Sequence, residues 1–149
     1  MPGTYSRILL HTVFSTKDRA NLITPTIQPE LYAYMGGIVR DMKGVLFEIG
    51  GIANHVHMLV RWRTDESVAA LMREVKSGSS HWVHAHRGMA VFGWQEGYSA
   101  FSVSESQKEV VANYIRSQID HHRARTYEEE LLVILRVHQI EFDEKYLWG

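Results

Sequence analysis

Two histidines separated by one residue are the part of the sequence best suited to metal chemistry. His55 and His57 flank Val56 in the segment NHVHMLV, which reads as a β-strand. Alternate residues of a strand point to the same side, so both imidazoles face one way, with their Cα atoms about 6–7 Å apart. They can therefore bind one ion, and imidazole suits zinc, manganese, iron or nickel. Two neighbouring core histidines would give the same pattern, and a metal site needs a third ligand from elsewhere.

A phenol and an amide lie four residues apart in the segment VVANYIRSQIDHHR, residues 110–123. Helical spacing places Tyr114 and Gln118 together along one edge of an apolar stripe, with His121 and His122 one turn further on. The stripe consists of Val111, Ala112, Ile115 and Ile119. On spacing alone, the better explanation of Tyr114 is an aromatic at the helix boundary, and that of Gln118 is a solvated neighbour.

The hydrophobic pattern predicts the elements that must position these side chains. Strands are expected at residues 6–16, 45–52, 55–62 and 98–104, and helices at 26–42, from 64 or 65 onward, from 104 to about 123, and at 127–137. Two capping boxes, Ser104 with Gln107 and Thr126 with Glu129, mark the starts of the last two helices. The order β-α-β-β-α-β followed by helices indicates the α+β class. It predicts a ferredoxin-like split β-α-β antiparallel sheet, with two helices on one face and additional C-terminal helices.

Composition narrows the class of protein without naming an activity. The 149 residues indicate one domain, with a core at about 5–104, a tyrosine helix at about 105–124 and a C-terminal helix at about 126–138. The absence of cysteine excludes disulfides and thiolate metal sites, and agrees with a cytoplasmic location. No apolar run is long enough to span a membrane. The net charge of −1 gives none of the basic excess usual in duplex-binding proteins.

Taken together, the histidine pair and the tyrosine helix resemble the single-tyrosine HUH transposases, which mobilise small insertion sequences as single-stranded DNA, and their relatives associated with repetitive extragenic palindromes. The resemblance rests on NHVHML, on Tyr114 with Gln118 four residues later, and on HTVFSTKDR, LMREVKSGSSHWV, FGWQEGYSAFSVSESQ and FDEKYLWG. It covers nearly the whole chain. Family members usually have Asp where this chain has Asn54, which keeps the shape and hydrogen-bonding capacity of that residue but not its charge.

The resemblance implies a transposase that cuts and rejoins single-stranded DNA at hairpin ends. Tyr114 would attack a phosphodiester, giving a 5′-phosphotyrosine link and a free 3′-OH. His55, His57 and Gln118 would hold the divalent metal, Mg²⁺ or Mn²⁺, that polarises the phosphate. The resemblance also implies a homodimer in which the tyrosine helix acts in trans, completing the partner's histidine site.

Basic side chains that could contact DNA phosphates lie in two segments. They are Lys17 and Arg19 after the first strand, and Arg73, Lys76, His84 and Arg87 on the polar face of the long helix. A solvated helix face would look the same. Three other functions remain open: a domesticated nuclease for chromosomal palindromic repeats, a non-catalytic nucleic-acid-binding module and a metal-dependent hydrolase.

Overall fold

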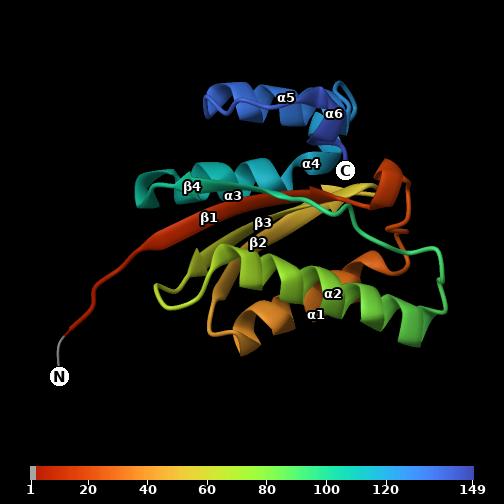
Figure 1. The fold of residues 1–149 in the computed structure, drawn as a ribbon, viewed down its shortest axis with the longest axis horizontal. Coiled ribbons are helices and arrows are strands. Elements are labelled where there is room, and N and C mark those ends of the chain that lie inside the picture. The colour runs from red at the N-terminus through yellow and green to blue at the C-terminus, as the bar shows by residue number, and fades with distance from the viewer. Residues whose placement is uncertain (1–2) are drawn as a thin grey trace.

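A computed structural model describes residues 3–149 and contains one four-stranded antiparallel sheet (Figure 1). The strands are β1 (Ile8–Ser15), β2 (Val45–Ile52), β3 (His55–Trp62) and β4 (Ser99–Val103), in the spatial order β2-β3-β1-β4. Each neighbouring pair runs antiparallel. This order, with one helix between β1 and β2 and another between β3 and β4, confirms the predicted ferredoxin-like α+β fold.

Two helices cover one face of the sheet and bury the main core. These are α1 (Gln28–Asp41) and α2 (Val68–Arg87), which lie together below the sheet in Figure 1. The side chains of β3 that alternate with the histidines point into this layer. The core includes Val56, Met58 and Val60 from β3, Leu31, Met35 and Val39 from α1, and Leu71, Met72 and Val75 from α2. The predicted apolar side of the histidine strand is therefore correct.

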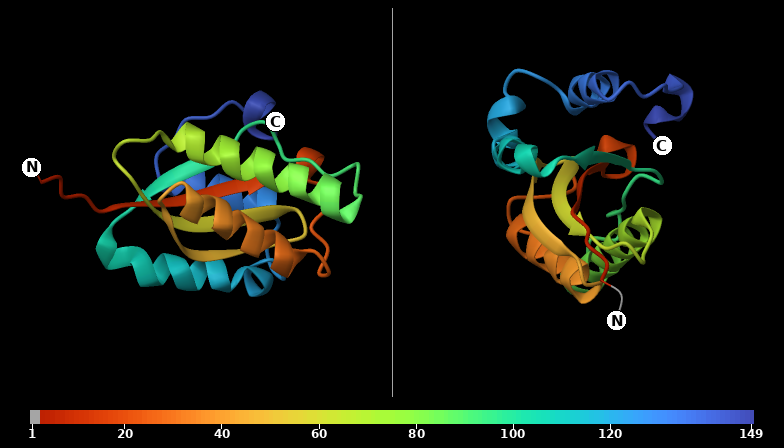
Figure 2. Two further views of the ribbon diagram at one scale, coloured as in Figure 1. Left: turned by 90° about the horizontal axis from the view of Figure 1, so that it is seen from below. Right: turned by 90° about the vertical axis from the view of Figure 1, so that its left-hand side faces the viewer.

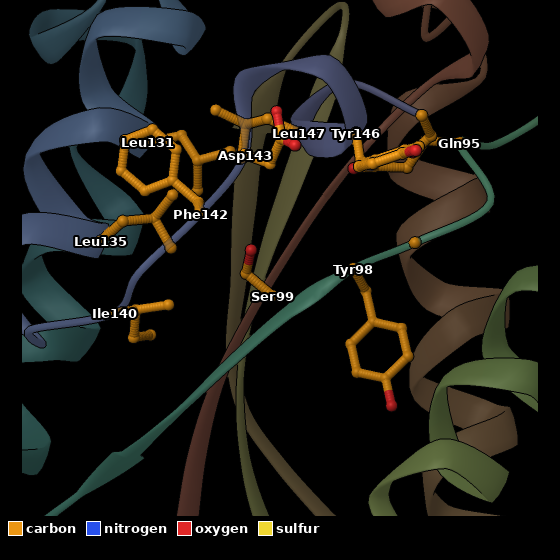
Figure 3. Close-up of a pocket in the computed structure, with 12 residues that line it drawn as sticks. Gln95, Tyr98, Ser99, Leu131, Leu135, Ile140, Phe142, Asp143, Tyr146 and Leu147 are labelled. Carbon is orange, nitrogen blue, oxygen red and sulfur yellow. The ribbon is translucent and has the colours of Figure 1, made fainter.

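The C-terminal helices lie on the opposite side of the sheet (Figures 1 and 2). They are α3 (Lys108–Arg116), α4 (Gln118–His121), α5 (Tyr127–Val137) and α6 (Glu144–Leu147). The 3-10 turn η2 (Glu105–Gln107) leads into α3, whereas a second 3-10 turn, η1 (Lys17–Arg19), follows β1. Apolar contacts hold α5 in place, through a cluster of Val13, Phe101, Tyr127, Leu131 and Leu135. Figure 3 shows Leu131 and Leu135 beside a hollow that is also lined by Phe142 and Leu147. Within residues 3–149, no helix is both long and apolar enough to cross a membrane.

The tyrosine helix differs from its prediction at both its start and its end. The Ser104 side chain caps no helix, because the chain first forms the 3-10 turn η2, and Ser104 instead contacts Ser106. A break at Ser117 then separates α3 from α4. Beyond the break, Gln118 is buried, whereas Ile119, which was predicted to lie on the apolar stripe, is 64% exposed. The capping box of Thr126 and Glu129 is confirmed.

A glycine lets the tyrosine helix approach the sheet closely. A Cβ atom added at Gly50 of β2 would lie 2.4 Å from the backbone oxygen of Ile115, which follows Tyr114 directly. No side chain fits at that distance, so the close packing of α3 on β2 depends on glycine. Gly50 of β2 pairs with His57 of β3. Gly50 therefore helps to set the distance between Tyr114 and the strand that carries the histidines.

Candidate active site

The two histidines of β3 face the C-terminal helices and are fully buried. Their Nε2 atoms meet the same carboxylate oxygen, Oε1 of Glu130 on α5, which lies 3.3 Å from His55 and 3.0 Å from His57. The prediction that both rings point to one side of the strand is correct. The sequence reasoning did not find Glu130, which comes from a helix more than seventy residues further along the chain.

Two residues of the α4 region complete the group of polar atoms. Nε2 of His122 lies 3.3 Å from Oε1 of Glu130, and Oε1 of Gln118 lies 3.0 Å from Nε2 of both His55 and His122. His55, His122 and Glu130 each offer one ligand atom within 4.8 Å of the others. They could therefore hold a metal ion, and the predicted ligands His55, His57 and Gln118 lie in the same group.

The hydrogen bonding of His55 supports a cation at this position. Its Nδ1 lies 2.9 Å from Oδ1 of Asn54, an acceptor, so Nδ1 carries the hydrogen and donates it. Its Nε2 faces two further oxygen atoms, Oε1 of Gln118 and Oε1 of Glu130. A ring nitrogen and two oxygens that converge in this way could hold a divalent cation. Asn54 thus offers His55 an acceptor oxygen.

The tyrosine predicted as nucleophile belongs to the same group. The hydroxyl of Tyr114 donates a short hydrogen bond to Oε2 of Glu130, and Nε2 of Gln118 donates to that oxygen at 3.0 Å. The rings of Tyr114 and His57 lie edge to face, with centroids 5.7 Å apart. Burial, followed by the hydrogen bond to Glu130 and by the negative charge of that side chain, raises the pKa of Tyr114 above its ordinary value of 10. The phenol is therefore protonated in this arrangement and needs a proton acceptor before it can attack.

Glu130 is the only carboxylate that the described residues place among these histidines. Burial alone would raise its pKa, but contacts with His122, His55 and His57 outweigh burial and lower the pKa below its ordinary value of 4.5. The side chain is consequently charged, with almost no contact with solvent. A buried carboxylate surrounded by imidazoles is a good environment for a divalent cation.

A fourth histidine, also not predicted, supports this group from β1. Nε2 of His11 lies 2.8 Å from Nδ1 of His57, and both rings are buried. Burial, and next the neighbouring His57, lowers the pKa of His11 to about 3, so its ring is neutral. Such a contact fixes the orientation of a metal-ligating histidine through its second nitrogen.

The missed residues left weak signals in the sequence. Glu130 is a charged side chain on the apolar stripe of α5, between the buried Tyr127 and Leu131. His122 follows Gln118 by one helical turn. His11 is a polar residue at an inward position of an apolar strand. Each signal depends on how separate elements pack, which local spacing does not determine.

A surface pocket leads to the tyrosine. It has a volume of about 400 Å³ and is lined by Tyr114, His121, His122, Arg125 and Glu130 together with Asp120 and Ala124. The site is therefore not sealed, because Tyr114 and Glu130 both line this pocket. Arg125 was not predicted either, and it adds positive charge at this entrance.

The predicted DNA-contact residues are divided between two parts of the molecule. Arg73, Lys76, His84 and Arg87 lie on α2, on the side of the sheet opposite to the histidine pair. Several of these side chains already have partners: Lys76 donates to the carbonyls of Glu96 and Gly97, His84 contacts that of Phe92, and Arg87 pairs with Glu30.

The other two predicted contacts, Lys17 and Arg19, lie in η1. Arg19 pairs with Glu128 of α5 at 2.9 Å. DNA contact by the six residues stays a prediction.

Comparison with known proteins identifies the family. The family model described as "Transposase IS200 like" matches residues 4–118. The chain belongs to this transposase family. The match includes the histidine pair, Tyr114 and Gln118, and ends before His122 and Glu130. It supports a DNA-processing enzyme that binds DNA, and the resemblance inferred from the sequence is confirmed.

Two solved transposase structures share the fold. One is a candidate transposase from Deinococcus radiodurans R1, 17% identical, with a TM-score of 0.63 over 79% of this chain and 95% of that one. The other is a tyrosine transposase associated with a REP element and bound to a REP hairpin, 15% identical, with a TM-score of 0.61 over 82% of this chain and 73% of that one. No curated protein matched the chain.

Proposed function

We propose that this transposase cuts and rejoins single-stranded DNA with Tyr114 as its nucleophile, using a divalent ion, and that it recognises hairpin ends of an insertion sequence. One observation carries the proposal: the Tyr114 hydroxyl and the side chains of His55, His57 and Gln118 converge on a single carboxylate. The hairpin-bound relative adds support for a folded single strand as substrate.

Each side chain of the site would have a separate role in such a reaction. His55, His57 and Gln118 would hold Mg²⁺ or Mn²⁺, and imidazole ligands favour Mn²⁺. The ion, when bound, would polarise the scissile phosphate and stabilise its developing charge. Tyr114 would attack the phosphorus and become linked to the 5′ phosphate, while the 3′ oxygen leaves. His11 would keep His57 oriented throughout.

Two surface hollows lined by basic side chains indicate where the DNA would lie. The pocket beside Tyr114 presents Arg125 and His121 to an entering phosphate. On the α2 side, Arg73, Lys76 and the half-exposed Tyr98 line another hollow, in which phosphate contact and base stacking would be combined. Figure 3 shows the Tyr98 ring directed away from the C-terminal hollow.

The arrangement of subunits is part of the proposal. In this structure Tyr114 lies beside the histidines of its own chain. The homodimer with a tyrosine helix acting in trans stays a prediction, and it would require α3 and α4 to be exchanged between copies. Mixing Tyr114→Phe with His57→Ala tests it, since only exchange would restore one complete site.

Formation of a covalent adduct tests the proposed chemistry. The protein is incubated with Mn²⁺ and a labelled pool of single-stranded hairpin oligonucleotides with varied flanks, and adducts are resolved on a denaturing gel. We expect an adduct with the wild type and none with Tyr114→Phe. Tyr34→Phe, on α1 at the far side of the sheet, is the matched control and should behave as the wild type. An adduct with Tyr114→Phe, or none with a wild type that binds the DNA, would refute the nucleophile.

A further inference from the structure

We propose that Glu130 links the metal site to the nucleophile: Oε1 is a ligand of the ion, and Oε2 takes the proton of Tyr114 as its oxygen attacks. The inference rests on the proposed function and assigns a residue outside the part of the chain matched by the family model. It makes α5, which the chain places over the sheet by apolar packing, a part of the catalytic machinery.

The position of Oε1 fits that of a ligand in a shared set. It lies 3.0 Å from Nε2 of His57 and 3.3 Å from Nε2 of both His55 and His122. Ligand atoms about 2.1 Å from one ion are separated by about 3.0 Å in octahedral and about 3.4 Å in tetrahedral geometry. The observed distances fall in this range. A carboxylate also supplies the negative charge that imidazoles and an amide lack, and hard divalent ions favour oxygen ligands.

The position of Oε2 fits that of a proton acceptor. It accepts hydrogen bonds from the Tyr114 hydroxyl and from Nε2 of Gln118. The second bond holds the carboxylate so that Oε2 faces the phenol and Oε1 faces the histidines. No other carboxylate within residues 3–149 is hydrogen-bonded to the Tyr114 hydroxyl. An acceptor already in hydrogen-bond contact with the nucleophile meets the geometric requirement for a general base.

The step balances as follows. The Tyr114 oxygen forms a bond to phosphorus while its proton passes to Oε2 of Glu130, and the bond from phosphorus to the 3′ oxygen breaks. The departing 3′ oxygen takes a proton from water. In the rejoining step an incoming 3′-OH attacks the phosphotyrosine and gives its proton to the hydroxide that the first step left in solution. The bond from phosphorus to the tyrosine oxygen breaks, and Glu130 returns its proton to that oxygen. No oxidant and no energy source is needed.

Two measurements on Glu130→Gln test the two halves of the inference. Mn²⁺ binding is measured by electron paramagnetic resonance without DNA, and adduct formation is measured at saturating Mn²⁺ with the hairpin pool. Glutamine keeps the shape of glutamate but carries no charge and accepts no proton. We expect Mn²⁺ to bind at least about tenfold more weakly, and adduct formation to stay slow when the site is saturated. Glu109→Gln, exposed in the first turn of α3, is the matched control and should change neither.

Each outcome decides one half. Unchanged Mn²⁺ binding in Glu130→Gln would overturn the ligand role. Adduct formation restored to the wild-type rate by saturating Mn²⁺, or faster than wild type, would overturn the role as proton acceptor, and the faster rate would identify Glu130 as a block on the site. If the wild type forms no adduct, the proposed function fails, and the ligand role is still decided by Mn²⁺ binding. Should Glu130→Gln not fold, Glu130→Asp replaces it. This shorter carboxylate should keep more of the Mn²⁺ affinity than of the adduct-forming rate.

Discussion

Replacing Leu135 with alanine should loosen the helix that carries Glu130. Leu135 lies on α5, is 4% exposed and belongs to the cluster that docks α5 on β1 and β4. Leucine-to-alanine changes at buried sites cost about 2–5 kcal/mol. The cluster has only five buried members and borders a hollow lined by Leu131 and Phe142, so neighbours can relax into the space (Figure 3). We therefore expect the lower end, about 2–3 kcal/mol.

A loss of this size raises the open population of α5 about 30- to 150-fold, because each 1.4 kcal/mol is about a factor of ten. Hydrogen exchange followed by mass spectrometry should show this increase in peptides covering α5, and urea unfolding should give the total loss of stability. Val133→Ala is the control, since Val133 is on the same helix but 39% exposed. Equal effects of the two substitutions, within about 0.5 kcal/mol, would refute the view that apolar packing holds α5 over the site.

Three further predictions concern the parts that position the site. Gly50→Ala should lower the free energy of unfolding by about 1–3 kcal/mol in urea titrations and slow adduct formation, because the new methyl group collides with the backbone of Ile115. Thr126→Ala should cost about 1 kcal/mol by removing the capping box with Glu129, seen as a lower midpoint in thermal unfolding. Burial, followed by a neighbouring imidazole, lowers the pKa of His11 from 6.5 to about 3, so the unfolded chain binds a proton there that the folded chain does not. Stability should fall as pH decreases from about 6.5 toward 3, by up to about 1.4 kcal/mol per pH unit, and His11→Asn should show a shallower decrease in urea unfolding across that range.

The sequence was sufficient for features that depend on local pattern. The strands at 45–52 and 55–62 were predicted with the bounds that the structure gives, because two apolar runs are joined by a two-residue turn at Ala53 and Asn54. Strand alternation placed His55 and His57 on one side. The capping box at Thr126 gave the start of α5.

Features that depend on tertiary contacts were not predictable in the same way. The segment around Ser117 contains no proline or glycine that would predict the helix break there. The break accompanies the contact of Gln118 with His55, sixty-three residues earlier in the chain. The helix that carries Glu130 was predicted, but the sheet surface on which this helix docks was not. Without knowledge of that surface, Glu130 cannot be distinguished in the sequence from an exposed glutamate. Local sequence propensity predicts a helix or strand, but it does not predict which other element that helix or strand packs against.

The end of the family-model match at Gln118 divides the site in an unexpected way. The portion that identifies the family contains the histidine pair and the tyrosine, whereas His122 and Glu130 belong to the remaining tail of the chain. Under the proposed assignments, a substitution at Glu130, or a change in how α5 docks, would alter both the ion site and the surroundings of the tyrosine in this chain. It would do so without changing any residue in the matched part.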